Sequence, residues 1–467
     1  MKLLRPLRTG LALFFFIAIT LLFLDASGTF SRWFGWTAKL QFLPSVMAMN
    51  VFVIAFLILL TLLAGRIYCS VICPLGVLQD IVSRVRITLF KKRNPFKYVK
   101  EHKWLRYAVW VVFLAAYLAG IQVVVALLAP YSAYGRIVRT LVHPAGAVAI
   151  IVAALTLLLV GILAWTGGRT YCNSICPVGT TLSFFSRFAM FRPVIDEQNC
   201  KNCRICEHNC KAQCIDIANH KIDYSRCVDC FDCIGGCKFD ALHYKYAWGA
   251  KKSGLSPASE PGSNGRRAFL SGAALGLGAL TLNAQKKKVD GGFAAVLDKE
   301  IPTHDTPLTP PGSKSVKDFY SRCTACQLCI SECPNGVLRP STDLSRLMQP
   351  EMAYEKGYCR PECTRCSQLC PAGAIIPISR EEKTEYHIGT AHVNRSLCVA
   401  QEGTKCGNCA RHCPVGAIQM VENEDLGNTI PAVNEQICIG CGACENLCPV
   451  RPISAITVNG RHNHLNI

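Results

Sequence analysis

The sequence lacks the short motifs that mark several large enzyme classes. Its 467 residues contain no nucleophile triad, no phosphate-binding loop and no nucleotide fingerprint. The glycine-rich stretch Gly272–Gly278 lies in an apolar segment without a preceding strand, so it does not indicate a dinucleotide site. Histidine is absent from the long apolar runs, which argues against haem held inside a membrane. None of these chemistries is therefore predicted.

Acidic residues are also scarce, and the cysteine count is not even. The chain has 31 Asp and Glu against 50 Lys and Arg, a net charge of +19, which first suggests nucleic acid or an anionic membrane surface. The odd number of cysteines, 29, excludes a fully paired disulfide set within one chain. With 51% hydrophobic residues the chain is not disordered. Its length allows roughly two to four domains.

Four long apolar runs lie in the first 170 residues, at Thr9–Leu24, Val46–Ala64, Leu105–Leu128 and Ala145–Trp165. A helix needs about 20 apolar residues to span a bilayer, and the last three runs meet that length. The first run is shorter and also fits a cleaved signal peptide, although three further runs favour a span. The pattern predicts an α-helical membrane domain of four spans, with room for a fifth.

The basic residues predict the orientation of this domain, residues 1–190. The segment Arg66–Arg106 holds ten Lys and Arg and two acids, whereas Asp25–Ser45 and Pro130–Pro144 hold two basic residues each. By the positive-inside rule the N-terminus and the 66–106 loop face the cytoplasm. Topology thus accounts for much of the positive charge, and no nucleic-acid partner is predicted.

A twelve-residue segment occurs twice in this domain. Residues 65–76, GRIYCSVICPLG, recur 103 residues later as residues 168–179, GRTYCNSICPVG, with eight of twelve positions identical. Cysteines four apart lie on one side of a helical turn. The two pairs together offer four thiolates, enough for one [4Fe–4S] cluster, and a pair of reducible dithiols is the alternative. The cysteines concerned are Cys69, Cys73, Cys172 and Cys176.

Two regular cysteine runs follow in residues 191–245. They are Cys200, Cys203, Cys206 and Cys210, then Cys227, Cys230, Cys233 and Cys237. Both have the spacing C-x2-C-x2-C-x3-C, which suits a [4Fe–4S] cube, and in two-cluster ferredoxins the fourth cysteine binds the other cube. We therefore expect Cys237 to complete the first cube and Cys210 to complete the second. Lysine, not the usual proline, follows each run, and Cys214 is left over.

Four more runs occur in residues 316–460. They are Cys323, Cys326, Cys329 and Cys333; Cys359, Cys363, Cys366 and Cys370; Cys398, Cys406, Cys409 and Cys413; and Cys438, Cys441, Cys444 and Cys448. The second run widens its first gap by one residue, and the third places Cys398 on a longer loop. The sequence leaves open which runs share their clusters: neighbouring runs share them, or the outer two runs share theirs around the inner two. Structural zinc usually takes two well-separated pairs, so these six runs predict six [4Fe–4S] clusters in small α+β modules of the bacterial ferredoxin kind.

A linker, residues 246–315, separates the two groups of runs. Within its segment 265–284, Arg266-Arg267-Ala268-Phe269-Leu270 precedes a mildly apolar stretch and looks like a twin-arginine export signal. That route carries folded domains, which suits a domain whose cubes are inserted in the cytoplasm. A soluble linker helix is the alternative, and Lys286–Lys288 oppose translocation. We expect a periplasmic C-terminal domain.

These features together resemble a known family. The repeated Cys-x3-Cys-Pro followed by a two-cluster ferredoxin looks like the NapH-type membrane quinol-dehydrogenase subunit of periplasmic nitrate reductase systems. The twin-arginine segment followed by four runs looks like its NapG-type ferredoxin partner, so the chain resembles the two fused. The membrane module is also similar to methylamine-utilisation ferredoxins and to proteins that assist nitrous-oxide reductase or copper-oxidase assembly.

The resemblance implies a multi-pass protein of the bacterial inner membrane, with its first ferredoxin domain cytoplasmic. It would relay electrons from quinol to a partner such as a cytochrome c or a reductase, as a component of a quinol dehydrogenase system and not a stand-alone enzyme. The alternative is a redox accessory protein for metalloenzyme maturation or sensing. Quinone-site candidates are His102, Gln122 and His143. If the last domain is exported, about 30 Å of hydrocarbon separates the two cluster groups, and a quinone or another subunit must connect them.

Overall fold

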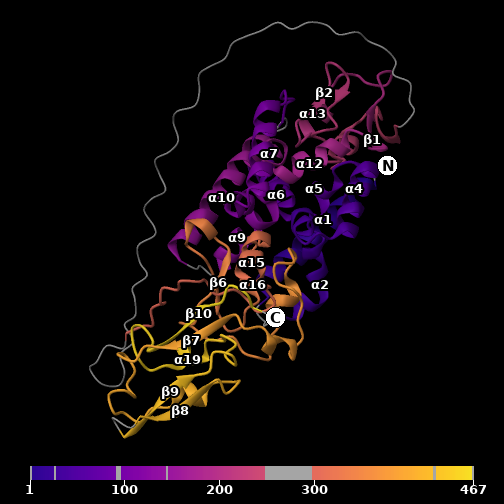
Figure 1. Ribbon diagram of the computed structural model, residues 1–467. Coiled ribbons are helices and arrows are strands. Elements are labelled where there is room, and N and C mark those ends of the chain that lie inside the picture. Colours follow the sequence, from indigo (N-terminus) through magenta and orange to yellow (C-terminus); the bar gives the residue numbers. More distant parts are fainter. Residues whose placement is uncertain are drawn as a thin grey trace.

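The computed structural model of the chain describes residues 3–25, 28–90, 96–142, 146–247, 297–423 and 427–464. The segment 265–284 and His143 lie outside the described residues. Three parts follow one another along the chain: a helical part up to residue 190, a first cysteine-rich part from residue 191 to 247, and a C-terminal part from residue 297 (Figure 1).

Helices alone build the described residues of the helical part. In order they are α1 (Leu4–Leu24), α2 (Thr29–Lys39), α3 (Phe42–Met47), α4 (Val51–Ala64), α5 (Ile67–Val71), α6 (Pro74–Leu89), α7 (Lys103–Leu118), α8 (Gln122–Leu128), α9 (Pro130–Val142), α10 (Ala147–Gly167), α11 (Thr170–Ser174) and α12 (Pro177–Ser186).

The predicted spans are confirmed only in part. Helices α1 and α10, of 21 residues each, are long and apolar enough to cross a membrane, about 31 Å at 1.5 Å per residue. The run Val46–Ala64 is broken because Met49 is left-handed (φ 52°) and the Asn50 side chain caps α4, which has only 14 residues. The run Leu105–Leu128 is broken at Gly120 (φ 74°), between α7 and α8. The prediction of four continuous spans is wrong for these two runs.

The helices occur in two copies of one order. Helix α11 begins 103 residues after α5, and α12 begins 103 residues after α6. Helix α9 takes the place in the second copy that α2 has in the first, and α10 takes the place of α3 and α4 together. Helix α6 packs on α10, while α12 packs on α4. The twelve-residue repeat therefore lies within a larger repeat whose two copies interlock.

The first cysteine-rich part is small and mixed in structure. Strand β1 (Phe191–Ile195) pairs antiparallel with β4 (Leu242–Tyr246), with Phe191 opposite Tyr246. A shorter hairpin joins β2 (Ile215–Asp216) to β3 (Lys221–Ile222), and the helices α13 (Ile205–Asn209) and α14 (Asp232–Gly236) lie between the strands in sequence. This is the α+β module that the sequence predicts.

The C-terminal part is also built from short helices and short strands, over a longer stretch of chain. Its elements are α15 (Val316–Arg322), α16 (Leu328–Ser331), β5 (Leu338–Pro340), a 3-10 turn (Leu344–Arg346), β6 (Pro350–Met352), α17 (Arg365–Leu369), a second 3-10 turn (Glu382–Glu385), β7 (Gly389–Val393), α18 (Asn408–Arg411), β8 (Ile418–Asn423), β9 (Asn428–Val433), α19 (Ala443–Leu447) and β10 (Ile456–Gly460). Three antiparallel pairs form, β5 with β6, β7 with β10, and β8 with β9.

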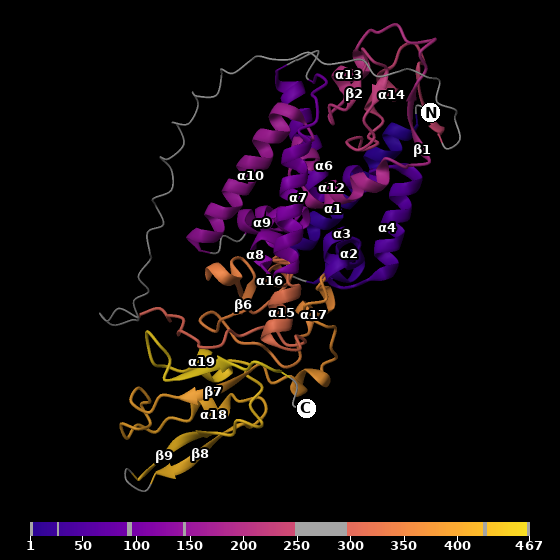
Figure 2. The same cartoon turned by 45° about the horizontal axis from the view of Figure 1, so that its top comes forward.

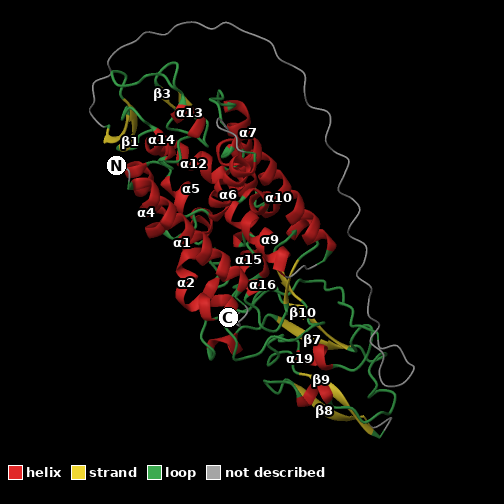
Figure 3. Cartoon of the chain, turned by 180° about the vertical axis from the view of Figure 1, so that it is seen from behind, coloured by secondary structure: helices red, strands yellow, loops and turns green. Residues whose placement is uncertain are grey.

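The two cysteine-rich parts lie at opposite ends of the helical part (Figures 2 and 3). At one end, Arg5 near the start of α1 forms an ion pair with Asp232 of the first part (2.8 Å). At the other end, the ring of Phe23 of α1 packs at a tilt against Tyr131 of α9 (5.7 Å between ring centroids), and α1 also packs on α16 of the C-terminal part. A single helix therefore runs from one cysteine-rich part to the other.

Candidate metal centres

The six cysteine runs come together as sets of four thiols. In the first cysteine-rich part, a cavity of about 340 Å³ is lined by Cys200, Cys203, Cys206 and Cys237, here called set 1. A second cavity, of about 400 Å³, is lined by Cys227, Cys230, Cys233 and Cys210, here called set 2. The fourth cysteine of each run thus lies with the other run, which is the grouping expected from the sequence. That each set holds a cube stays a prediction.

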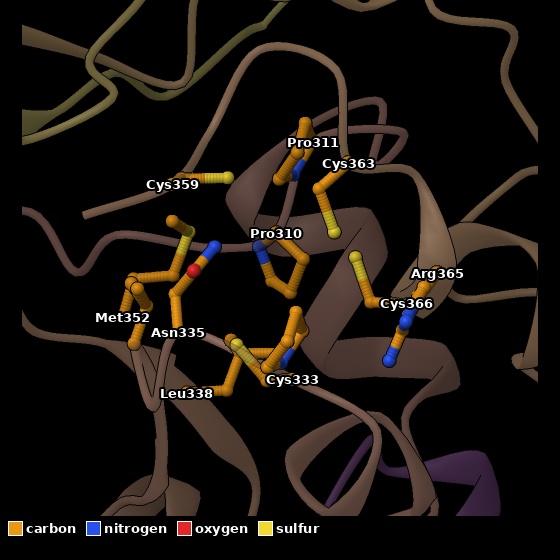
Figure 4. Close-up of a pocket in the computed structure, with 12 residues that line it drawn as sticks. Pro310, Pro311, Cys333, Asn335, Leu338, Met352, Cys359, Cys363, Arg365 and Cys366 are labelled. Atoms are coloured by element: carbon orange, nitrogen blue, oxygen red, sulfur yellow. The ribbon is translucent and has the colours of Figure 1, made fainter. Parts of the chain in front are cut away.

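Neighbouring runs also exchange their fourth cysteines in the C-terminal part. Set 3 consists of Cys323, Cys326, Cys329 and Cys370. Set 4 consists of Cys359, Cys363, Cys366 and Cys333 around about 370 Å³ of empty space. Set 5 consists of Cys398, Cys406, Cys409 and Cys448 around about 350 Å³. Set 6 consists of Cys438, Cys441, Cys444 and Cys413. Figure 4 shows the thiols of set 4 around their cavity, so the arrangement in which the outer runs pair is not adopted.

The backbone around the second cysteine of each regular run is left-handed on both sides. The residues concerned are Asn202 and Arg204, Asp229 and Phe231, Ala325 and Gln327, and Gly440 and Gly442, with φ between 48° and 77°. Such alternation turns successive backbone N–H groups toward one concave space, a form found at many iron–sulfur sites. Six of these eight residues carry a side chain, for which this conformation is costly. The strain is what a site built for bound sulfide would show.

The donor sets suit a polynuclear iron–sulfur group. Each set offers four thiols around a cavity, and N–H groups also reach the thiols, as Ala241 N does to Cys237 Sγ (3.3 Å) and Ala417 N to Cys413 Sγ (3.2 Å). Among the described residues, no cluster of His, Cys, Asp or Glu converges on a point that fits one metal ion. Burial raises the pKa of Cys206 to about 11 and that of Cys326 to about 12, so these thiols must lose protons when they bind iron.

Cys214, the cysteine that the spacing left over, lies against set 2. Its side chain is buried and lines the set 2 cavity, and its Sγ is 3.5 Å from Cys210 Sγ. The hydrogen bond that its thiol donates lowers the pKa of Cys210 to about 7. No spacing in the sequence reveals this position, because Cys214 belongs to no run.

The two Cys-x3-Cys-Pro pairs meet at the interlocked repeat. Cys69 and Cys172 lie on α5 and α11, while Cys73 and Cys176 precede the first residues of α6 and α12, and each of the four is only 3% exposed. Burial raises the pKa of Cys176, and negative charge on the other three thiols raises it further, because all four share one space. These four cysteines are called the quartet below.

Arginines cross between the two copies in a reciprocal way. Arg66 Nη2 of the first copy donates to the carbonyl oxygen of Cys172 (3.1 Å), and Arg169 Nη1 of the second copy donates to the carbonyl oxygen of Cys69 (2.5 Å). A Cβ added to Gly76 would lie 2.2 Å from the Cys69 oxygen. Glycine is required there because the backbone of the same copy folds back so closely on itself, and Gly179 repeats the contact with the Cys172 oxygen at 2.3 Å. The arginine of the other copy lies against the same glycine, with Arg169 Nη1 2.7 Å from the added Cβ of Gly76.

Buried cations outnumber carboxylates beside the quartet. Both Arg66 and Arg169 are fully buried. Asp80 accepts two hydrogen bonds from Arg169 (2.8 Å each) and one from Arg8 (2.6 Å), and Lys211 Nζ lies 3.6 Å away. Burial alone would raise the pKa of Asp80, but Arg169, Lys211 and Arg8 together hold it well below its ordinary value. The excess positive charge suits an anionic group held by four thiolates.

The quinone-site candidates do not form one site. His102 is exposed at the start of α7, and His143 lies outside the described residues. Gln122, at the start of α8, is buried, and its Oε1 has no hydrogen-bond partner among the described residues. Of the two candidates that the structure describes, Gln122 is the one with a buried polar atom free to meet a ligand.

Comparison with known families agrees with these donor sets. A family model described as a 4Fe-4S binding domain matches residues 46–97 and 146–194, which contain the two halves of the quartet. A second, described as a 4Fe-4S dicluster domain, matches residues 404–451, which contain most of sets 5 and 6. The cysteines that these stretches contain are therefore of a type found in iron–sulfur proteins.

The relatives of this chain include proteins with ferredoxin-type names. An uncharacterized protein of Methanocaldococcus jannaschii is 34% identical over 40% of this chain and 67% of its own length. The ferredoxin-type protein NapF of Escherichia coli is 30% identical over 38% of this chain and 99% of its own length. The methylamine utilization ferredoxin-type protein MauM of Methylobacillus flagellatus is 31% identical over 31% of this chain and 64% of its own length. The chain therefore belongs to the family of 4Fe–4S ferredoxin-type proteins.

Proposed function

We propose that this chain is a membrane-bound iron–sulfur protein that relays electrons from the quinol pool to a redox enzyme. The observation that carries the proposal is the grouping of 24 cysteines into six sets of four, each lying beside the next within its own part. When bound, a [4Fe–4S] cluster supplies one-electron transfer. A quinol gives up two electrons, so a series of such sites can divide the pair into single steps.

The order of the sets within the C-terminal part supports directed transfer. Sets 3 and 4 share two runs, and sets 5 and 6 share the other two. Between these pairs, Cys359 N of set 4 donates a hydrogen bond to the carbonyl oxygen of Cys441 of set 6 (2.9 Å). Sets 3, 4, 6 and 5 therefore form one series that leads away from the helical part, because β8 and β9, which flank set 5, lie farthest from it (Figure 2).

Lipid contact is supported by the apolar surface of the helical part. Helix α10 contains no charged residue, and its apolar side chains are widely exposed. Four of them are each more than half exposed: Ile151, Leu155, Leu158 and Ile162. Apolar surface of this extent is unusual on a soluble monomer and suits hydrocarbon. We therefore propose that α1 and α10 cross the membrane.

The positions of the loops support opposite sides for the two cysteine-rich parts. The basic loop Arg66–Arg106 meets the first part, where Arg106 donates to Ser225 and Tyr98 N donates to Glu207 Oε1 (3.0 Å). Positive loops face the cytoplasm. We propose that the first cysteine-rich part is cytoplasmic and the C-terminal part periplasmic, with the twin-arginine segment between them in sequence. This is the arrangement that a fusion of NapH-type and NapG-type proteins would have.

Burial of the quartet argues against the maturation alternative. A dithiol that reduces copper or a partner's disulfide needs an accessible sulfur atom. The quartet thiols are 3% exposed, and backbone carbonyls, arginines and the proline-started helices α6 and α12 enclose them. The relay is therefore the function that the geometry supports best.

The test is reduction of the clusters by quinol. The full chain, purified in lipid nanodiscs with its iron, is mixed anaerobically with menaquinol or ubiquinol, and electron paramagnetic resonance follows the reduced clusters. We expect signals from reduced [4Fe–4S] clusters with either quinol, and we expect them to disappear when an oxidised partner cytochrome is added. Reduction by dithionite without any reduction by quinol would overturn the proposal.

A further inference from the structure

We infer that the quartet is a seventh [4Fe–4S] site and that it joins the two cysteine-rich parts into one electron path across the helical part. The inference rests on the proposed function only in taking the six sets as cluster sites. It replaces the expectation that a quinone or another subunit must connect them.

On one side, hydrogen bonds join the segment that carries Cys172 of the quartet to the residues that follow Cys210 of set 2. Arg169 N donates to the carbonyl oxygen of Lys211 (2.9 Å), the residue after Cys210 of set 2. Asn173 Nδ2, beside Cys172, donates to the carbonyl oxygen of Ala212 (3.3 Å). Asn173, the residue after Cys172, therefore contacts the loop that begins at Cys210 of set 2.

On the other side the quartet approaches set 3 through the start of α9. Tyr171, beside Cys172, donates its hydroxyl hydrogen bond to the carbonyl oxygen of Leu128 (3.2 Å). Three residues further along the chain, the buried Tyr131 lies beside Cys326 and Cys370 of set 3. The contact is tight, because a Cβ added to Gly135 would lie 2.4 Å from the carbonyl oxygen of Cys326. The C-terminal part thus comes within a few residues of the quartet.

The charges around the quartet suit a resident cluster. A [4Fe–4S] cube with four thiolates has a charge of about −2. Arg66 is fully buried, and its guanidinium donates to Asn173 Oδ1 (2.9 Å), to the Ser225 carbonyl oxygen (3.0 Å) and to Cys172, none of which is a carboxylate. The carboxylate of Asp229 accepts the backbone N–H of Arg66 and its charge also faces Arg66, but the guanidinium itself donates to no carboxylate. A buried guanidinium in that position is costly unless another anion lies beside it. Four thiolates that hold a cube supply that anion.

Electron transfer through the quartet balances without bond changes. Each passage oxidises one donor cluster and reduces one acceptor cluster by a single electron, with no proton or leaving group. One quinol that becomes quinone releases two protons and two electrons, which is enough for two passages.

The first test counts iron in the wild-type protein. The full chain, purified in nanodiscs after anaerobic reconstitution with iron and sulfide, is expected to hold about 28 iron atoms and 28 sulfides, seven cubes. The variant Cys73→Ser/Cys176→Ser is expected to hold about 24. A wild-type count of about 24 that the variant leaves unchanged overturns the inference, and this count needs no electron transfer at all.

The second test follows electrons from one side. Vesicles that expose the first cysteine-rich part are mixed with dithionite, an impermeant anion, and the reduction of sets 3–6 is followed by rapid-freeze electron paramagnetic resonance. We expect sets 3–6 to be reduced in the wild type and at least tenfold more slowly in the double variant. Fully reduced samples in detergent that keep the signals of all six sets show that the variant has folded.

The outcomes separate the inference from the proposed function. Equal reduction rates in wild type and variant overturn the inference, whatever quinol does. Reduction of sets 3–6 by dithionite through the quartet, together with no reaction with quinol, would uphold the inference and overturn the proposed quinol relay.

Discussion

The two copies of the repeat share their cysteines but differ in the residues that hold these cysteines in place. Position 80 of the first copy is Asp80, which binds Arg169 of the second copy, whereas the matching position 183 is Ser183, whose hydroxyl donates to the Thr180 carbonyl oxygen (2.6 Å). Arg66 instead meets Asn173, whose match in the first copy is Ser70. Duplication thus supplies four thiols, and later divergence gives each arginine a different partner.

The largest difference is expected at Asp80. Replacing Asp80 with Asn removes the carboxylate that Arg169 and Arg8 share, while Lys211 keeps its ion pair with Asp232 (2.9 Å). Breaking such a buried pair costs about 3–5 kcal/mol of unfolding free energy. The matching change Ser183→Ala removes one hydrogen bond, about 1 kcal/mol. Thermal unfolding in nanodiscs compares the two, and equal losses would contradict the proposed asymmetry.

The same carboxylate predicts a pH dependence. The pKa of Asp80 is held below its ordinary value of 3.8 by its three cations, so its contribution to stability is complete above about pH 4. That contribution is lost as the pH falls toward the lowered pKa. We expect wild type and Asp80→Asn to converge in stability below pH 4, as measured by denaturation across pH, and parallel curves would show that Asp80 is not the titrating group.

The copies should behave alike where the contact is the same. Gly76→Ala and Gly179→Ala each force a Cβ against a backbone carbonyl at 2.2 and 2.3 Å, and overpacking of this kind costs about 1–3 kcal/mol. The control Gly161→Ala on α10 has open space around the new methyl group and should be neutral or stabilising. The iron content and the unfolding temperature of each variant measure these effects. A Gly76→Ala variant with unchanged values would contradict the close contact between position 76 and the Cys69 carbonyl oxygen.

A smaller change makes the second copy more like the first. Asn173→Ser gives the second copy the residue of the first, and it removes the hydrogen bonds to Arg66 and to the Ala212 carbonyl oxygen. At about 1 kcal/mol for each bond, we expect a loss of about 2 kcal/mol. The control in the first copy is Ser70→Ala, which removes only the hydrogen bond from the Ser70 hydroxyl to the Ile67 carbonyl oxygen (3.1 Å) and should cost about 1 kcal/mol. Equal losses of unfolding free energy in the two variants would remove the distinction between the copies.

The smallest effect is expected at the tyrosines of α9, beside the C-terminal part. The Tyr131 hydroxyl is buried beside set 3 without a partner among the described residues, whereas the Tyr134 hydroxyl meets Thr20 (2.6 Å). A hydrogen bond from the Tyr131 hydroxyl to the set 3 cluster would stabilise its reduced form by about 1 kcal/mol. Tyr131→Phe should therefore lower the reduction potential of that cluster by about 40 mV. Tyr134→Phe should leave it unchanged in redox titrations, and a shift of both would point to a general loss of packing.

The grouping of the first two cysteine runs was predictable because it depends on spacing, whereas spacing left open which of the four C-terminal runs exchange their fourth cysteines. The spacing C-x2-C-x2-C-x3-C led to Cys237 and Cys210 as exchanged members, and the structure places them so. Cys398 was harder, because its seven-residue loop carries no pattern, yet it lies with its set. Cys214 was not predictable, since its position depends on the fold of the loop and not on a repeat.

The membrane helices were predicted less well, for a physical reason. Hydropathy records apolar side chains but not backbone direction, so it passed over Gly120 and Met49, where left-handed residues end the helices. The meeting of the two Cys-x3-Cys-Pro pairs was expected from the repeat, but the crossed arginines were not, because an Arg beside a Cys motif looks the same in sequence whichever copy it contacts.

The left-handed residues of the regular runs connect the fold to iron supply. Asn202, Arg204 and their four non-glycine counterparts each cost about 1 kcal/mol in that conformation, a sum comparable with the whole stability of a small domain. Metal binding would offset this unfavourable free energy, because in small modules the free energy of metal binding also stabilises the fold. A cell short of iron would therefore hold this chain with unfolded ends, open to proteolysis, so its abundance would follow the iron available to it.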